Sequence, residues 1–161
     1  MRVFYEDWQM ECCGTPFAVG DKVSWKLVAY DAEAVREGRG YGAEAWVENH
    51  GGPDEATVGR VRAIDLVHQA YLAHTDRRAR ARVDRALEPS ESRGVIFLPS
   101  PYSTEPVPGA YTVEAVGTCP KWFESQEPGR DPGPHRIRRT RGALVTLDVP
   151  DGTPPQPGDH R

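Results

Sequence analysis

The sequence has few cysteines and no long apolar run. No stretch approaches the roughly 18 apolar residues of a membrane-spanning helix, and Glu6 and Asp7 lie where a signal peptide would need an apolar segment. We therefore expect a soluble, cytoplasmic protein with no membrane contact. Three cysteines are an odd number, and in a reducing compartment they fit free thiols or a metal site better than a disulfide framework.

Motifs of common catalytic sites are also missing. The chain has no G-x-S-x-G elbow and no pair of C-x2-C motifs, and the "GRGYG" stretch at 38–42 lacks the preceding strand and the Lys-Ser/Thr of a phosphate-binding loop. Neighbouring carboxylates such as Glu6 and Asp7 point to opposite faces of a strand and do not converge. These absences favour a non-enzymatic protein.

Proline and glycine, in contrast, are plentiful. The 161 residues include 15 prolines and 16 glycines, and the mean hydropathy is -0.62. This composition indicates that much of the chain is loop around one modest core. The net charge of -4 argues against strong binding of polyanions by the whole surface, although a local basic patch remains compatible with it.

Alternating apolar residues predict about five strands. The first covers 2–10, with Phe4, Trp8 and Met10 on its apolar face. The second follows a turn at Gly20 and carries Val23, Trp25 and Leu27 on one side. The other predicted strands cover 57–72, 110–119 and 142–149, with 95–98 as a possible sixth. The period over 57–72 also fits a helix, but its β-branched residues favour a strand.

One helix is predicted over 76–88, since Asp76 can cap it and Pro89 ends it. Residues 31–56 are interpreted as a loop excursion with helical turns at 31–37 and 43–49. Residues 88–109 are a second loop excursion. Residues 150–161 are expected to be a disordered tail.

A single small sheet would leave its apolar face exposed, and closure into a barrel buries that face. We therefore predict a mainly β fold: a small antiparallel β-barrel of the SH3-like or OB-like kind with one surface helix, forming one domain over 1–149. A sandwich of two sheets is the alternative.

The stretch "WQMECCGTPFAVGDKVSW" at 8–25 resembles the opening of an uncharacterised family of small actinobacterial proteins, with the pattern WQ-x-x-CCG-x-PF-x-VG-x-x-V-x-W. The likeness extends to "VGRVRAI", "PVPG" and "ALVTLDV". The resemblance implies a shared domain of unknown role, and it brings no activity and no catalytic residue with it.

The cysteines suggest a zinc site. Cys12 or Cys13 could join Cys119 and His68 if their strands are neighbours, because zinc favours a tetrahedron of sulfur and imidazole ligands. Adjacent cysteines on a strand point to opposite faces, so at most one would face the core. Packing of these thiols as small apolar side chains is the simpler alternative. A nucleophilic thiol served by His68 or His74 is disfavoured, because nearby acidic residues would raise its pKa.

Two arginine clusters suggest contact with nucleic acid. Arg78, Arg82 and Arg85 lie on the predicted helix, and Arg138 and Arg139 belong to the "HRIRRTR" stretch. Small barrels bind single strands through such cations together with exposed aromatic rings. Trp8 and Trp25, however, are assigned to the core. The main functional prediction is therefore a non-enzymatic interaction module for a protein or small-molecule partner, with zinc binding and single-stranded nucleic-acid binding as alternatives.

Overall fold

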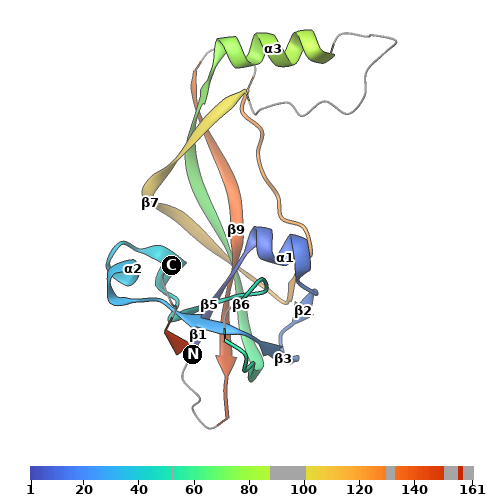
Figure 1. Cartoon of the computed structure of the whole chain (residues 1–161), viewed down its shortest axis with the longest axis vertical. Coiled ribbons are helices and arrows are strands. Elements are labelled where there is room, and N and C mark those ends of the chain that lie inside the picture. The colour runs from blue at the N-terminus through green and yellow to red at the C-terminus, as the bar shows by residue number, and fades with distance from the viewer. Residues whose placement is uncertain (52, 88–100, 130–132, 151–155, 158–161) are drawn as a thin grey trace. The chain divides into compact units, whose positions relative to one another are not determined.

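The computed structural model describes residues 1–51, 53–87, 101–129, 133–150 and 156–157. Its elements, in chain order, are β1 (Arg2–Glu6), α1 (Asp7–Cys13), β2 (Phe17–Ala18), β3 (Lys22–Trp25), β4 (Leu27–Ala29), α2 (Ala32–Arg36), the 3-10 helix η1 (Arg39–Gly42), β5 (Ala45–Val47), β6 (Thr57–Thr75), α3 (Arg77–Leu87), β7 (Tyr102–Val116), β8 (Thr118–Cys119), β9 (Pro134–Asp148) and β10 (Gln156–Pro157) (Figure 1).

The chain divides into two compact units. The first comprises Met1–Gln69, Tyr111–Glu124 and Thr140–Arg161, and the second comprises Ala70–Ala110 and Ser125–Arg139. The long strands β6, β7 and β9 contribute one part to each unit.

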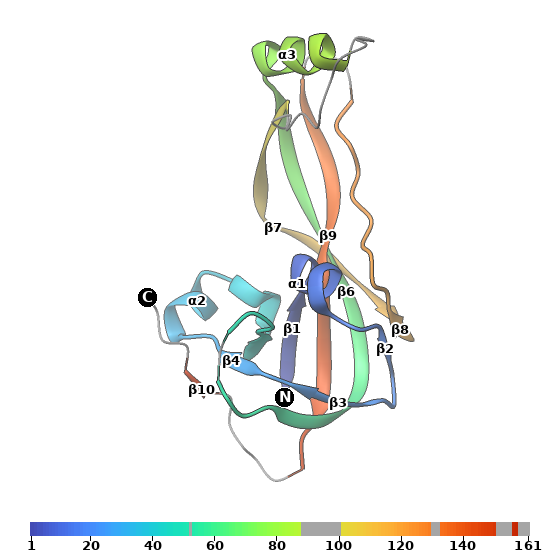
Figure 2. The same ribbon diagram turned by 45° about the vertical axis from the view of Figure 1, so that its right-hand side comes forward.

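The main sheet has the strand order β10-β4-β5-β1-β9-β6-β3, and β7 also pairs with β6. Strands β3 and β4 stand near opposite ends of this order, yet only Lys26 separates them in the chain. The sheet of the first unit therefore curls into a nearly closed barrel, in which β1 and β9 lie side by side (Figure 2). The predicted mainly β, barrel-like fold is confirmed. Two pairings, β1 with β5 and β4 with β10, are parallel.

The core of the first unit lies on both faces of β1. Val3 and Tyr5 belong to the main buried cluster with residues such as Val145. Phe4 points the other way and packs in a second cluster with Leu144. Three successive apolar residues are therefore buried, because the strand is covered on both faces.

The prediction that the first strand runs to residue 10 is wrong. The strand ends at Glu6, and α1 begins at Asp7. Met10 is fully buried as expected, and Trp25 is half-buried against the core, but Trp8 is 49% exposed and is not a core residue. A helix turns successive side chains by about 100°, so the two-residue alternation that linked Trp8 to Phe4 does not apply beyond Glu6.

Two segments interpreted as loops contain strands. Ala45–Val47 is β5 and not a helical turn. Residues 102–109 belong to β7 in spite of their prolines. Among the residues that the structure describes, β6 is the one strand paired with β7, so β7 lies at an edge, where a residue without a backbone N–H is tolerated. The possible strand at 95–98 lies outside the described residues.

Other predictions for the first unit are confirmed. The turn before β3 contains Gly20 with φ 96°, which a residue with a side chain would resist. The helical turn after Asp31 is α2, and the Asp31 carboxylate accepts a hydrogen bond from the Ala34 N–H at 2.6 Å. The strand assignment for 57–72 is correct, and β6 extends to Thr75.

The second unit contains α3, which the sequence predicts. Asp76 Oδ1 accepts hydrogen bonds from the N–H groups of Ala79 at 3.1 Å and Arg78 at 2.8 Å, which lower the Asp76 pKa and cap the helix. Tyr71, Ala73 and Ile137 form a small buried cluster in this unit. In the tail, Gln156–Pro157 pairs with β4, while 151–155 and 158–161 lie outside the described residues.

Candidate metal centre

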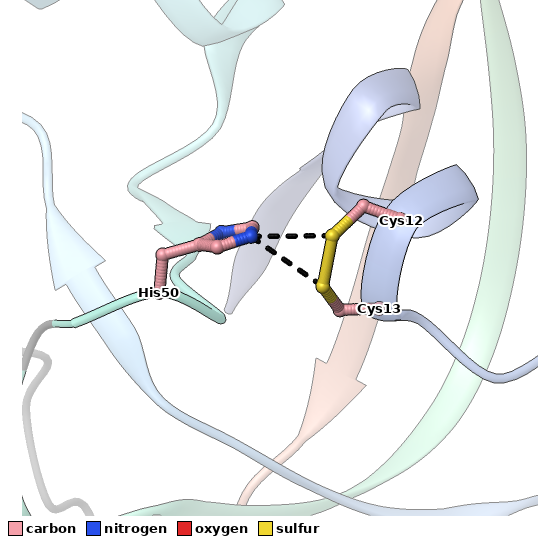
Figure 3. A group of neighbouring side chains, drawn as sticks. All are labelled: Cys12, Cys13 and His50. Atoms are coloured by element: carbon pink, nitrogen blue, oxygen red, sulfur yellow. Dashed lines mark hydrogen bonds between the residues drawn. A yellow bond between two sulfur atoms is a disulfide. The ribbon is translucent and has the colours of Figure 1, made fainter.

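The parallel pairing of β1 and β5 creates the candidate site. Val3 is paired with Ala45 and Phe4 with Trp46, so the chain leaves both strands at the same edge of the sheet. After β1 the chain forms α1, which ends in Cys12 and Cys13. After β5 it forms the short segment 48–50, which ends in His50. Two segments far apart in the sequence therefore meet (Figure 3).

Cys12, Cys13 and His50 form one exposed group. The Nε2 atom of His50 lies 3.2 Å from Cys12 Sγ and 3.4 Å from Cys13 Sγ. The two cysteines are joined by a disulfide bond. The three potential ligand atoms lie within 4.8 Å of one another, so the group could hold a metal ion.

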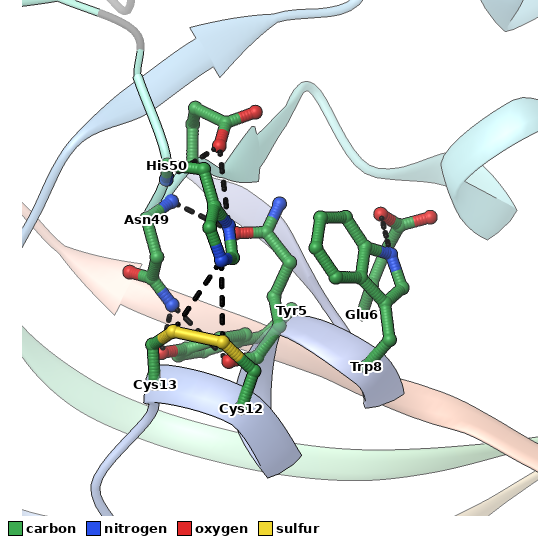
Figure 4. Close-up of polar contacts among 9 residues, drawn as sticks. Tyr5, Glu6, Trp8, Cys12, Cys13, Asn49 and His50 are labelled. Carbon is green, nitrogen blue, oxygen red and sulfur yellow. Dashed lines mark hydrogen bonds and ion pairs between the residues drawn. A yellow bond between two sulfur atoms is a disulfide. The ribbon is translucent and has the colours of Figure 1, made fainter.

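Several contacts fix the imidazole of His50 (Figure 4). The backbone N–H of His50 donates to Glu48 Oε1 at 2.8 Å, and the same oxygen lies 4.0 Å from Nδ1 of the His50 ring. The indole of Trp8 stacks on the imidazole with 5.1 Å between ring centroids. Trp8 is itself held by a hydrogen bond from its Nε1 to Glu6 Oε2 at 2.8 Å. This arrangement leaves Nε2 directed at the sulfur atoms.

Asn49 ties the His50 segment to α1. Its N–H donates to Gln9 Oε1 at 2.8 Å, and its side-chain Nδ2 donates to Tyr5 Oη at 2.9 Å and to the Gln9 carbonyl at 3.3 Å. Burial raises the pKa of Tyr5, and the hydrogen bond from Asn49 partly opposes that rise. The distance between His50 and the cysteines is therefore set by hydrogen bonds from Asn49 to the buried residues Tyr5 and Gln9.

A third segment holds the end of α1. Lys121 Nζ donates to the carbonyls of Met10 at 2.9 Å and Gly14 at 2.8 Å. The Phe123 N–H donates to Glu11 Oε1 at 3.2 Å. A cation at a helix C-terminus satisfies carbonyls that lack partners within the helix. This contact fixes the turn that carries both cysteines.

Beside the group lies an open cleft of about 450 Å³. It belongs to the first unit and runs between the segment after α1 and strand β3. Its lining residues are Tyr5, Cys13, Gly14, Thr15, Pro16, Phe17, Asp21, Lys22, Val23, Ser24, Trp25 and Asn49. Cys13 therefore borders both the His50 group and the cleft.

The other predicted metal ligands lie elsewhere. Cys119 is a free thiol with no exposed surface, and burial raises its pKa to about 12. His68 is buried, with Nδ1 2.9 Å from Thr140 Oγ1 and Nε2 3.0 Å from Glu114 Oε2. Within the described residues, neither belongs to a group that could hold a metal. The sequence analysis missed His50, because its position depends on a strand that was interpreted as a helical turn.

The five arginines proposed for nucleic-acid binding all lie in the second unit. Arg78, Arg82 and Arg85 are exposed on α3, and Arg138 is exposed on β9. Arg139 is half-buried, with its guanidinium carbon 5.5 Å from the centroid of the Tyr71 ring. Binding of single-stranded nucleic acid through these residues stays a prediction.

Among the described residues, no helix combines the length and apolar character needed to cross a membrane. A family model described as a family of unknown function (DUF6578) matches residues 1–149. This match confirms the resemblance to an uncharacterised family. No curated protein and no solved structure matches the chain.

Proposed function

We propose that this chain, which belongs to the family of unknown function DUF6578, is a zinc-binding module that uses Cys12, Cys13 and His50 in the dithiol state. The observation that carries the proposal is the approach of His50 Nε2 to both sulfur atoms. Zinc binds thiolate and imidazole ligands, and three protein ligands leave a fourth position for water or a partner.

The distances support this ligand set. With Zn–S near 2.3 Å and Zn–N near 2.0 Å, a tetrahedral ion places each sulfur about 3.5 Å from the imidazole nitrogen. The distances of 3.2 and 3.4 Å are slightly shorter than that value. The two sulfurs would have to separate, which requires reduction of the disulfide. Because the group is exposed, such a movement meets little packing resistance.

The surroundings of His50 support the same role. A histidine that binds a metal commonly directs its other ring nitrogen at a carboxylate, which fixes the tautomer and strengthens the ligand. Glu48 Oε1 lies 4.0 Å from Nδ1, beyond hydrogen-bond distance, so it would have to move closer to take that place when the ion binds. Stacking on Trp8 restricts rotation of the ring. The imidazole is therefore oriented before an ion arrives.

Binding is expected to depend on the redox state. Zinc is bound by thiolates, and a disulfide has none. The oxidised protein would lack two of its three ligands, and the reduced protein would have all three. The proposed module therefore binds zinc when the Cys12–Cys13 bond is open and releases it when the bond forms.

The test is a competition titration of zinc against a chelating indicator, with reduced protein from which the reductant has been removed. We expect binding of one zinc per chain, and loss of binding in Cys12→Ser, Cys13→Ser and His50→Ala. His74→Ala is the matched control, because His74 is an exposed histidine of the second unit. Equal zinc affinity in His50→Ala and His74→Ala would refute the proposal.

Glu48→Gln tests the role of the carboxylate. Glutamine keeps an oxygen for the His50 N–H but removes the charge near Nδ1. We expect a loss of roughly 10- to 100-fold in zinc affinity, as is typical for residues that orient a ligand. Glu37→Gln is the control, because Glu37 pairs with Arg39 on an exposed surface.

A further inference from the structure

We infer that the cleft beside Cys13 admits a small cysteine-derived thiol that exchanges with the Cys12–Cys13 disulfide. The inference concerns the oxidised, metal-free protein and does not rest on zinc binding. Its starting point is an asymmetry: both sulfurs are exposed, but of the two cysteines only Cys13 lines the cleft. A molecule held in the cleft would therefore meet the Cys13 sulfur.

The size of the cleft suits a small molecule. Its volume of about 450 Å³ lies in the usual range for small-molecule sites. The rings of Tyr5, Phe17 and Trp25 contact one another, with centroids 4.9 to 6.1 Å apart. Tyr5 and Phe17 are almost fully buried and Trp25 is half-buried, so these rings form a fixed wall beneath the more polar surface of the cleft.

The polar lining indicates the chemical class. Lys22 is exposed at the cleft and offers an ammonium group to a carboxylate. The neighbouring Asp21 is already engaged, because its Oδ2 accepts a hydrogen bond from the Ala18 N–H at 2.8 Å. Strand β3 is the last strand of the sheet, so its outer edge can offer backbone groups to an amide. A thiol with a carboxylate and an amide, as in a cysteinyl peptide, fits these groups.

The reaction is a two-step exchange. The thiolate of the bound molecule attacks Cys13 Sγ, the Cys12–Cys13 bond breaks, and Cys12 leaves as a thiolate that takes up a proton from solvent. Its sulfur lies 3.2 Å from His50 Nε2, within range of a hydrogen bond. A second thiol then attacks the sulfur of the bound molecule and releases Cys13. Two thiols are oxidised to one disulfide, and the protein disulfide is reduced to two thiols.

The first test measures how fast two thiols reduce the disulfide of the protein in the presence of a chelator. Glutathione has carboxylates and amides, and 2-mercaptoethanol has neither. We expect the rate with glutathione to saturate and to fall several-fold in Lys22→Gln, while the rate with 2-mercaptoethanol is unchanged. Lys26→Gln is the matched control, since Lys26 does not line the cleft. An equal effect of Lys22→Gln on both thiols would overturn the inference.

The second test compares how readily each protein sulfur reacts with a thiol compound that enters the cleft. In Cys12→Ser and Cys13→Ser one thiol of the pair remains, and mass spectrometry follows its mixed disulfide with oxidised glutathione. We expect the Cys13 thiol of Cys12→Ser to react several-fold faster than the Cys12 thiol of Cys13→Ser. Equal rates, or a faster reaction of Cys12, would contradict the proposal that a thiol compound in the cleft meets the Cys13 sulfur. We expect neither variant to bind zinc, so the two reaction rates do not depend on the zinc site. Failure of this inference is therefore distinguishable from failure of the zinc proposal.

Discussion

The Nε2 atom of His50 lies 3.2 Å from Cys12 Sγ and 3.4 Å from Cys13 Sγ, although these residues are 38 and 37 positions apart in the chain. The parallel pairing of β1 and β5 brings them together. Asn49 holds the histidine segment against α1, and Lys121 holds the end of that helix.

Two of the three cysteines should be reactive in the folded, reduced protein. Cys12 and Cys13 are exposed, whereas Cys119 is buried and has a pKa of about 12. Since the thiolate is the reacting form, Cys119 should resist a thiol reagent at neutral pH. We expect two thiols to be titrated before unfolding and three after it. Cys119→Ala should lose only the third, and rapid reaction of all three in the native protein would contradict the assignment.

Alkaline pH should destabilise the first unit through Cys119. Burial raises its folded-state pKa to about 12, so above the ordinary cysteine pKa the unfolded state binds fewer protons than the folded state. Stability is then lost as pH rises from the ordinary value toward the raised one. At full effect the slope is about 1.4 kcal/mol per pH unit.

The measurement is urea unfolding of the reduced protein between roughly pH 9 and 10.5. This range lies between the pKa of Cys119 in the unfolded chain and its raised pKa in the folded protein. Buried tyrosines with raised pKa values, such as Tyr5, act in the same direction. Cys119→Ala should therefore flatten the decline without abolishing it. An unchanged slope in that variant would show that Cys119 does not contribute.

Gly14→Ala should disturb the turn that carries the cysteines. An added Cβ would lie 2.7 Å from Tyr5 Oη and 2.8 Å from Met10 Cα, and it would also overlap the Met10 sulfur. Overpacking of this kind costs about 1 to 3 kcal/mol of unfolding free energy. Gly117→Ala is the control, since nothing lies within 4 Å of its added Cβ. Equal stability of the two variants, measured by urea unfolding, would argue against the packing around Gly14.

The hydrogen bond from Asn49 to Tyr5 should appear in a double-mutant cycle. Tyr5 Oη is buried and accepts from Asn49 Nδ2 at 2.9 Å. The cycle uses Tyr5→Phe, Asn49→Ala and the double variant. Asn49→Ala also removes the hydrogen bond from Asn49 Nδ2 to the Gln9 carbonyl, but it does so whether residue 5 is Tyr or Phe, so this loss cancels in the coupling energy. We expect a coupling of about 0.5 to 1.5 kcal/mol in the free energy of unfolding. A coupling of zero would mean that Asn49 positions His50 without help from Tyr5.

Much of the fold could be predicted from local patterns. The strand in 57–72, the turn at Gly20 and the capped helix after Asp76 each have their cause in adjacent residues. The sequence shows the apolar pattern of the strand, the glycine of the turn and the capping aspartate of the helix. Closure of the sheet followed from the need to bury an apolar face.

The candidate site was harder to predict, because its geometry depends on distant contacts. Helix α1 has seven residues, too few to be stable alone, and Lys121 and Asn49 stabilise it from far along the chain. Strand β5 has three residues, too few for a period to be recognised. The sequence predicted Cys12 and Cys13 as candidate ligands, but their neighbour His50 in the candidate group depends on these two elements.

X-ray absorption at the zinc edge tests the central claim most directly. The reduced protein is loaded with one zinc per chain, and the bond lengths and number of ligands of each kind are measured. We expect two sulfur ligands near 2.3 Å and at least one imidazole nitrogen near 2.0 Å, with the imidazole signal lost in His50→Ala. A zinc ion without sulfur ligands, or an unchanged imidazole signal in His50→Ala, would contradict the account.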